Sequence, residues 1–154
     1  MSEQPDVDLA ALVAAAGDAI IVADPEGMIR LWSPAAERVF GFTAGEALGC
    51  SLDLIIPERF RPQHWAGYRE VMRTGRTRYG ADVLRVPAER KDGRRISIAF
   101  TVALLQADGR VTGIAAIVRE ETARWEEEQR MRRRLAELEG GSSRASDDRP
   151  TSHP

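Results

Sequence analysis

His64 is the side chain of this sequence whose chemistry is easiest to put to use. It is one of two histidines in 154 residues, and the other, His153, stands close to the C-terminus. A neutral imidazole nitrogen is a good ligand for a transition metal. One cysteine, Cys50, and two histidines cannot make an ordinary zinc site without carboxylates. His64 is therefore either a lone metal ligand or, as the alternative, a capping side chain on a solvated helix.

No set of residues typical of an enzyme accompanies His64. The sequence contains no nucleotide-binding glycine loop, no nucleophile beside an evident base and no carboxylate pair placed for acid–base work. Cys50 has no partner for an internal disulfide, and we expect it to be a small buried hydrophobe. We predict that the chain is not an enzyme.

The composition favours a soluble globular protein. The chain is 43% hydrophobic and 30% charged, which disfavours both a disordered and a membrane-embedded chain. A formal net charge of −2 gives no field that would hold a nucleic acid or an anionic membrane. No apolar run approaches the roughly 18 residues of a membrane span, the start lacks the features of a secretion signal, and a lone cysteine is typical of a reducing compartment. We expect a cytoplasmic protein that binds neither nucleic acid nor membrane.

His64 falls in a predicted helix from Glu58 to Thr74, closed by Gly75. Cap residues, turn residues and apolar spacing predict four elements before it. They are a helix over Asp8–Ala16, a hairpin of Ala19–Ala23 with Met28–Trp32, a helix from Ser33 to Gly41, and a short helix from Thr43 to about Gly49.

Strands are predicted to follow that helix. They cover Tyr79–Glu89, Arg95–Val102 and Val111–Arg119, joined by turns at Lys91–Arg94 and Ala107–Arg110. Pro87 indicates an edge strand or a bulge. The order of elements predicts an α+β fold, with one antiparallel sheet and short helices on one face. A pocket for a small ligand is expected between the helices and the sheet.

Helical periodicity returns after the last strand, which sets the expected domain organisation. We predict a disordered start at 1–7, a sensor domain at 8–122, a C-terminal helix at 123–139 and a disordered polar tail at 140–154. The helix spans about two heptads, with apolar side chains at partly heptad-like spacing, so a coiled coil is possible. These apolar side chains are Trp125, Met131, Leu135 and Leu138.

Three sequence blocks together resemble the PAS domain family. They are Trp32–Thr43 with Glu46 and Gly49, Arg90–Gly93, and Arg119–Thr122, in which Glu120 replaces the more usual aspartate. The resemblance covers about Leu9 to Arg124. It implies a five-stranded antiparallel sensor fold that binds a cofactor or metabolite, or that pairs with another protein.

Within that family, His64 resembles the proximal heme ligand of oxygen-sensing PAS domains in certain histidine kinases and phosphodiesterases. Its distance from Thr74–Gly75 matches, and the Arg61–His64 segment resembles the phosphodiesterase type. The resemblance implies that His64 holds heme b and that the chain senses redox state or a diatomic gas (O2, CO or NO). A histidine also stands in this helix in many PAS domains not known to bind heme, so a cofactor-free reading stays open.

Further side chains are expected to form the heme pocket. The apolar wall would come from Trp65, Tyr68, Val71 and Met72 of the helix and from Ile96, Ile98, Ile114 and Ile117 of the sheet. Propionate partners would come from Arg69, Arg73, Arg76 and Arg78. The resemblance places the sixth iron position near Asp82–Arg85, with apolar Leu84 at the aligned position. Arg85, one residue on, can either donate a hydrogen bond to a bound gas or face water.

The leading hypothesis is a stand-alone sensor that acts on a separate signalling protein in trans and forms a homodimer. The alternative is a cofactor-free module that dimerises or docks on a separate kinase or regulator. A small heme peroxidase is a third possibility, although only Asp82 and Arg85 could serve as its distal acid–base pair. A flavin-type light sensor is disfavoured, because Gly49–Leu52 lacks the reactive-cysteine motif such sensors carry.

Overall fold

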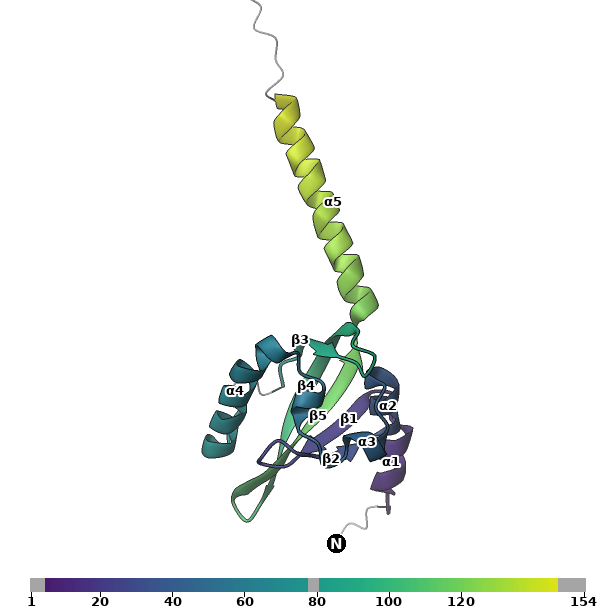
Figure 1. Cartoon of the computed structure of the whole chain (residues 1–154), viewed down its shortest axis with the longest axis vertical. Helices are drawn as coiled ribbons and strands as arrows, with labels where there is room; N and C mark the ends of the chain where they lie inside the picture. The colour runs from purple at the N-terminus through teal and green to yellow at the C-terminus, as the bar shows by residue number, and fades with distance from the viewer. Residues whose placement is uncertain (1–4, 78–80, 147–154) are drawn as a thin grey trace, which may run out of the picture. The chain divides into compact units, whose positions relative to one another are not determined.

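The computed structural model describes residues 5–77 and 81–146. Contacts divide the chain into two units, one ending at Glu120 and one beginning at Glu121, and each is described by itself. Figure 1 shows a sheet with helices in the first unit and a single long helix in the second. None of the helices in these described ranges combines the length and the apolarity that a bilayer crossing requires.

In the described part of the first unit, the helices precede the last three strands in the sequence. In chain order the elements are α1 (Leu9–Ala15), β1 (Ala19–Ala23), β2 (Ile29–Trp32), α2 (Pro34–Phe40), α3 (Ala44–Ala47), the 3-10 turns η1 (Leu52–Leu54) and η2 (Glu58–Phe60), α4 (Arg61–Thr74), β3 (Leu84–Glu89), β4 (Arg95–Ala107) and β5 (Arg110–Glu120). The predicted caps are present: the Ser33 hydroxyl accepts from the Ala36 N–H, and Thr43 and Glu46 form a capping box.

All five strands form one antiparallel sheet in the order β2-β1-β5-β4-β3. Because side chains alternate along a strand and cross-strand partners share a face, the register assigns every residue to one of two faces. The inner face carries Ile21, Val118 and Ile98, which are buried against the helices. The α+β class, the five-stranded antiparallel sheet and the helices on one face are therefore confirmed.

The core lies between the inner face of the sheet and helices α2 and α3. Phe40 of α2 and Ile29 of β2 are completely buried. The Trp32 ring packs 5.4 Å from the Phe40 ring, centroid to centroid, and its indole N–H donates to the Phe42 carbonyl at 2.9 Å. This half of the domain is consequently well packed and gives the other elements a fixed frame.

The outer face of the sheet is apolar and partly exposed. Ile117 of β5 and Leu105 of β4 expose 39% and 40% of their surface on this face. Ile20 of β1 pairs with Ile117 and is only half-buried. Helix α1 has no buried residue, and Leu9 and Leu12 on it are largely exposed. This face thus offers apolar surface that the described residues leave partly uncovered.

Strand β3 lies at the edge of the sheet and contains Pro87, as the sequence indicates. The strand begins at Leu84, however, and the predicted start at Tyr79 is wrong for Ala81–Val83, which have no strand structure. Alanine and aspartate are poor strand formers, which accounts for the later start. Tyr79 itself lies outside the described residues. Strand β4 extends past the predicted end at Val102, because its last five residues continue to pair with β5.

Helix α4 begins at Arg61 and not at Glu58 as predicted. The physical reason is Pro62, which has no N–H to donate to the Glu58 carbonyl, so an α-helix cannot run through from Glu58. Residues 58–60 form the separate turn η2, and Pro62 falls in the first turn of α4, where proline is tolerated. Gly75 closes the helix with a φ of 67°, as predicted.

The second unit is helix α5 (Thr122–Ser146). The helix passes through Gly140 and Gly141 and continues seven residues beyond Glu139, so the prediction of disorder is wrong for residues 140–146. Each glycine costs a helix only about 1 kcal/mol, and the sequence has no proline between Thr122 and Pro150 that would remove a helical hydrogen bond. The rest of the predicted disordered tail, 147–154, and residues 1–4 of the predicted disordered start lie outside the described residues.

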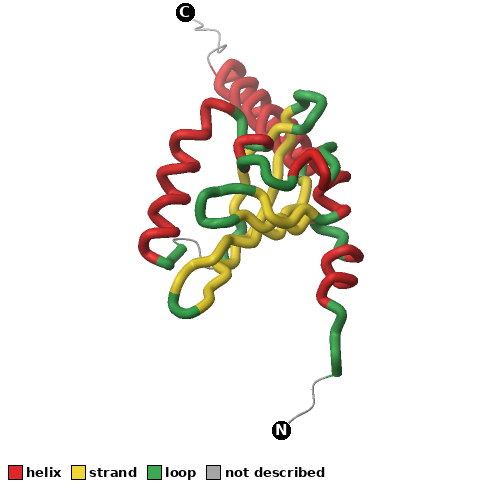
Figure 2. The backbone as a smooth tube through the Cα atoms, turned by 60° about the horizontal axis from the view of Figure 1, so that its bottom comes forward, coloured by secondary structure: helices red, strands yellow, loops and turns green. Residues whose placement is uncertain are grey.

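In the tube view of Figure 2, as in Figure 1, the β4–β5 hairpin projects beyond the other strands of the sheet. Its tip touches the C-terminal end of α4, which is distant in sequence: the Gln106 side-chain amide donates to the Gly75 carbonyl at 3.4 Å. The hairpin tip therefore supports one end of the helix that carries His64.

Candidate functional site

The candidate site is built on the side of α4 that faces the core. His64, Trp65, Tyr68 and Met72 share this side, because residues four apart in a helix lie one above the other. Tyr68 is buried, and Trp65 and Met72 pack against the buried core. The structure thus brings together four of the five helix residues that the sequence analysis assigned to a pocket, and Val71 is not among the side chains packed against the core.

Trp65 anchors the first half of α4. Its indole N–H donates to the Asp53 carboxylate at 2.7 Å, while the Arg61 guanidinium donates to the carbonyls of Ile56 (3.0 Å) and Asp53 (3.2 Å). The benzene half of the indole lies over Gly27, so close that a Cβ added to Gly27 would stand 2.2 Å from two ring carbons. Only glycine permits this approach at the β1–β2 turn.

Tyr68 anchors the middle of the same helix. Its hydroxyl donates to the Asp24 carbonyl at 2.5 Å, and burial raises the pKa of this hydroxyl, which keeps it protonated as a donor. Together with the Gln106–Gly75 contact, these bonds hold α4 at its start, middle and end. Trp65 and Tyr68 therefore fix the position of α4 through the β1–β2 turn and η1, besides any contribution to a pocket wall.

His64 is half-buried between these anchors. Its ring centroid lies 4.7 Å from that of Trp65 and 5.8 Å from that of Tyr68. The Nδ1 atom is buried and has no hydrogen-bond partner in the described structure. Burial lowers the pKa of His64, and the nearby charge of Asp53 acts in the opposite direction. The imidazole is consequently neutral near neutral pH, with a nitrogen lone pair able to bind a metal.

This burial predicts a pH-dependent stability. Because the pKa of His64 is lower in the folded state, the unfolded state binds more protons as the pH falls through about 6.5. We expect the free energy of unfolding of the cofactor-free protein to fall between pH 8 and pH 5, measured by urea titration. The fall should be smaller in His64→Ala, in which the carboxylate contributions are unchanged. Equal pH profiles for the two proteins would contradict the burial of this imidazole.

Asp53 is the acceptor on which the anchoring of Trp65 depends. We expect Asp53→Ala to destabilise the protein by about 1–2 kcal/mol, because the indole N–H loses its acceptor. Asp53→Asn keeps a carbonyl oxygen and should retain most of that stability. Urea unfolding followed by tryptophan fluorescence measures both variants. Equal losses in Asp53→Ala and Asp53→Asn would mean that the negative charge, and not the hydrogen bond, is what matters.

Part of the inner face of the sheet is incompletely covered. We call the apolar residues of this part of the inner face the inner strip. They are Leu84, Val86, Phe100, Val102, Leu104, Ile114 and Ala116. Val86 is 39% exposed although its register places it on the inner face, whereas Ile98, its partner on β4, is 5% exposed. Apolar side chains left partly exposed on the helix-covered face of a sheet are a favourable surface for an apolar ligand.

The register separates the sheet residues proposed for the pocket. Leu84 and Ile98 lie on the inner face, but Arg85 pairs with Ala99 and Ile117 pairs with Ile20, all on the outer face. Arg85 and Ile117 were therefore wrongly assigned to the pocket. The physical reason is the two-residue period of a strand, which directs Arg85 away from Leu84 and Ile117 away from Ile114.

The described arginines proposed for the heme propionates are exposed to solvent. Arg73 is exposed and forms an ion pair with Glu70 at 2.6 Å within α4, and Arg69 and Arg76 are also exposed. Arg78 lies outside the described residues.

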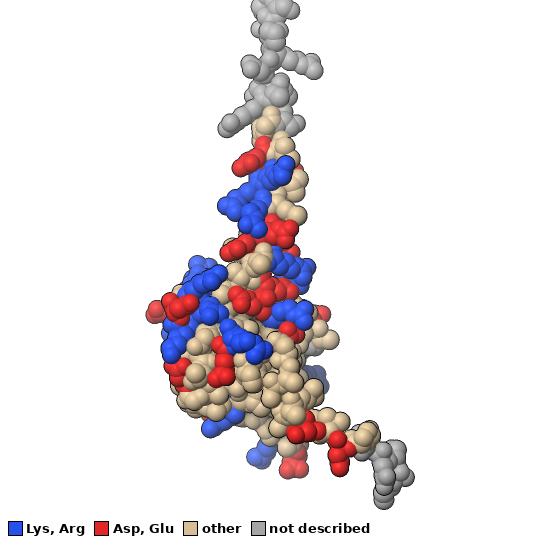
Figure 3. Space-filling model, turned by 90° about the vertical axis from the view of Figure 1, so that its right-hand side faces the viewer, with Lys and Arg blue, Asp and Glu red and all other residues tan. Residues whose placement is uncertain are grey.

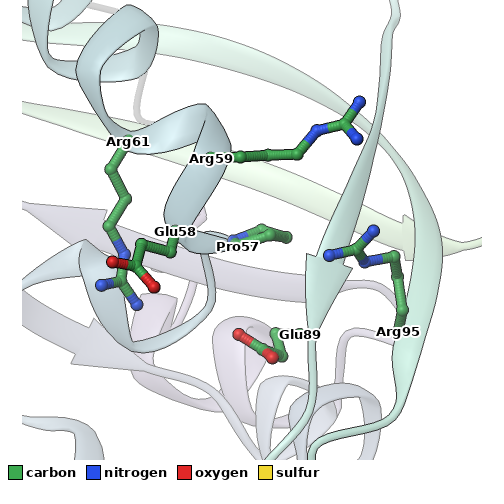
Figure 4. A pocket seen from close by; sticks show the side chains of 6 residues that line it. All are labelled: Pro57, Glu58, Arg59, Arg61, Glu89 and Arg95. Atoms are coloured by element: carbon green, nitrogen blue, oxygen red, sulfur yellow. The ribbon is translucent and has the colours of Figure 1, made fainter.

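A charged pocket lies apart from the His64 side chain. It has a volume of about 620 Å³ and is lined by Pro57, Glu58, Arg59, Arg61, Glu89 and Arg95. Figure 4 shows the guanidinium groups of Arg59 and Arg95 on one side of the opening, with Arg61 turned to the other side. Two carboxylates share the lining with three guanidinium groups, so the pocket has no strong preference for one sign of charge.

Several residues of the site could not be identified from sequence alone. Asp53 and Gly27 contact Trp65 from elsewhere in the chain, and no local pattern signals such a contact. Val86 and Phe100 were detectable in principle, because Leu84, Val86 and Ala88 alternate and the partner positions on β4 alternate with them.

Within the described ranges, no three His, Cys, Asp or Glu side chains are grouped to hold a metal ion. Any metal at His64 must bring its other ligands with it, as a macrocycle does. The arrangement therefore provides one neutral imidazole, held by an anchored helix, and an apolar inner strip on the sheet.

A five-stranded antiparallel sheet, with helices and a partly covered apolar strip on one face, defines a small α+β domain suited to ligand binding. The sequence model of the PAS fold matches residues 13–126. The chain therefore belongs to the PAS family, and the resemblance in the three sequence blocks is confirmed.

Two curated relatives match part of the chain. The oxygen sensor protein DosP of Escherichia coli (strain K12) is 29% identical over 89 residues, 58% of this chain and 11% of that protein. The sensor protein FixL of Bradyrhizobium diazoefficiens is 34% identical over 93 residues, 60% of this chain and 18% of that protein. The chain thus matches less than a fifth of the length of either relative.

Solved structures support the fold. A PAS domain from Colwellia psychrerythraea superposes with a TM-score of 0.66 at 19% identity, over 75% of this chain and 95% of that one. An RNA-binding Light-Oxygen-Voltage receptor superposes with a TM-score of 0.67 at 22% identity, over 88% of this chain and 41% of that one. At these identities the likeness concerns the fold alone.

Proposed function

We propose that this PAS domain binds heme b through His64 and senses a diatomic gas or redox state. The observation that carries the proposal is the His64 ring: it is half-buried on the core-facing side of α4, and its buried Nδ1 atom has no partner. A buried polar nitrogen without a partner costs about 1–3 kcal/mol, so such an atom calls for an explanation. A ligand role for the imidazole supplies one.

Two features of the chain support a porphyrin as the group bound at His64. The inner strip offers partly exposed apolar side chains, and Met72 adds another from α4. A single protein ligand suffices, because the macrocycle provides four nitrogens. Heme iron held there would supply reversible gas binding and a one-electron redox change. The similarity to an oxygen sensor protein and to a second sensor protein supports the same function.

The faces of β3 bear on which gas is favoured. Leu84 lies on the inner face, whereas Arg85 lies on the outer face, so no charged side chain of β3 reaches the inner strip. An apolar distal side gives a bound gas no hydrogen-bond donor. We therefore propose an open site that favours the more polar bound O2 over CO less than a site with a distal donor does.

Visible spectroscopy tests the proposal. Purified protein is mixed with hemin, reduced with dithionite and exposed to CO. We expect one equivalent of hemin to bind and to give a Soret band that shifts on reduction and again with CO. A spectrum identical to that of free hemin, at protein concentrations up to about 50 µM, would rule out the heme function.

A second candidate function is a cofactor-free interaction module that docks on a separate kinase or regulator. The apolar outer face favours it, since Ile117 and Leu105 are about 40% exposed there and an exposed apolar patch often marks an interaction surface. This candidate predicts colourless protein and a partner whose binding is weakened by Ile117→Glu. Docking through the outer face does not by itself conflict with a heme on the inner face, but a colourless protein would exclude the heme function.

We also propose that the protein is a homodimer and that it signals to a separate protein in trans. Besides the outer face, α5 carries apolar side chains that stay exposed in the single chain. A gas or redox change at His64 would bias one of two conformations of the domain and so change its contacts. Sedimentation analysis of the full chain tests the dimer.

A further inference from the structure

Helix α5 carries a short apolar seam in its middle part. Met131, Leu135 and Leu138 expose 59%, 57% and 66% of their surface. If Leu135 is position a of a seven-residue repeat, Met131 and Leu138 both fall at position d. Glu128 and Arg124, one turn and two turns before Met131, form an ion pair with each other at 3.4 Å within the helix. These charged a and d positions add no apolar layer to the seam before Met131.

Four charged residues flank this seam. In the same repeat, Glu127 and Arg134 occupy position g, and Arg132 and Glu139 occupy position e. None of the four has an ion-pair partner within the described part of its own chain. Acidic and basic side chains follow one another along the face of α5 that Figure 3 shows. The four charges are thus available to a partner helix.

The charge pattern is complementary to itself. In a parallel in-register pair, position g of one helix faces position e of the next heptad of its partner. This rule places Glu127 against Arg132 and Arg134 against Glu139 of the other copy, and the two-fold axis repeats both contacts. The same alignment stacks Met131, Leu135 and Leu138 each on its twin.

We propose that α5 pairs with α5 of a second copy of this chain as a parallel, in-register coiled coil over Met131–Glu139. The inference rests on the proposed homodimer and adds its orientation and register. It requires no other partner, because every apolar layer and every flanking charge finds its complement in the identical helix.

An antiparallel pair satisfies fewer of these contacts. In an antiparallel pair each a position faces a d position of the other helix, so Leu135 can oppose either Met131 or Leu138 of the second copy. In either alignment, at most two layers have apolar side chains from both helices. With Leu135 opposite Met131, Leu138 meets Glu128, and Arg132 and Arg134 each come close to their own twins. Like charges at such close range disfavour this alignment.

Disulfide cross-linking of the full chain distinguishes the orientations. Met131→Cys and Leu138→Cys are each made in a Cys50→Ser background and oxidised by air with copper–phenanthroline. In the parallel pair both cysteines lie beside their twins, within the 4–7 Å Cα separation that a disulfide needs. Each antiparallel alignment moves one of the two pairs about 15 Å apart. Arg133→Cys, on the opposite side of the helix, is the control.

We expect both seam variants to form disulfide-linked dimers quickly, and the Arg133→Cys control at least about tenfold more slowly. Cross-linking of only one seam variant, or of neither in a protein that sediments as a dimer, would overturn the parallel register and leave the proposed homodimer intact. A monomer in sedimentation equilibrium would overturn both. Folding of each variant is checked by circular dichroism.

Charge reversal provides a second test. Glu127→Arg replaces both attractive Glu127–Arg132 contacts with repulsive ones, and we expect the dimer dissociation constant to rise on the order of tenfold at low salt. Adding Arg132→Glu restores opposite charges and should recover most of the affinity. A double variant as weak as the single variant would contradict the pairing.

Discussion

Gly27→Ala is expected to destabilise the protein by about 3 kcal/mol. Gly27 has a φ of 81°, which an L side chain rarely adopts, and its new Cβ would stand 2.2 Å from Cη2 and Cζ3 of Trp65. The indole cannot move freely, because its N–H is bound to Asp53. Urea unfolding measures the loss.

The control for this substitution is Gly49→Ala. Gly49 has nearly the same φ, 82°, but no atom lies within 4 Å of an added Cβ, so only the backbone cost of about 1 kcal/mol applies. A combined Gly27→Ala, Trp65→Ala variant removes the clash and should cost less than the sum of the two single variants. Equal effects of Gly27→Ala and Gly49→Ala would show that the Trp65–Gly27 contact does not constrain α4.

His64→Ala is expected to weaken hemin binding by more than about a hundredfold. Loss of a residue that merely orients a metal ligand costs 10–100-fold in metal affinity, and loss of the ligand itself should cost more. The measurement is a hemin titration followed by the Soret band, with and without dithionite and CO. If the variant keeps the hemin affinity and the spectra of the parent protein, the assignment of His64 as the iron ligand is wrong.

Chemical rescue separates ligation from folding. His64→Gly leaves room for a free imidazole, and we expect millimolar imidazole to restore a ligated spectrum in that variant. His153→Ala removes the other histidine of the chain and should bind hemin like the parent protein. A collapsed variant would not be rescued by imidazole, and its circular dichroism would show the loss of fold.

Local patterns were sufficient to predict most of the fold. Ser33 followed by Pro34, and Thr43 followed by Glu46, marked two helix starts, because caps and first-turn residues act within a few positions. Apolar or alternating runs, together with turn residues between them, marked the five strands, although the start of β3 and the end of β4 were misplaced. The start of α4 was predicted three residues too early, because Pro62 cannot donate to the Glu58 carbonyl as a continuous α-helix requires.

The candidate site was only partly predictable. Spacing placed His64 and Tyr68 on one side of a helix, and the structure agrees. The assignment of Ile117 beside Ile114 ignored the odd spacing between them, which places two strand residues on opposite faces. The anchoring of Trp65 by Asp53 and Gly27 could not be inferred, because it depends on where separate parts of the chain meet in space.

The two ends of the sheet determine how copies of this domain can associate. At one edge, β3 carries Pro87, which has no N–H to offer an incoming strand, and at the other edge β2 is only four residues long. Both features disfavour an added strand at either border, and therefore growth into a continuous intermolecular sheet. A signalling contact made by this protein is thereby restricted to side chains on faces and helices, where ligand-dependent shifts can make and break it reversibly.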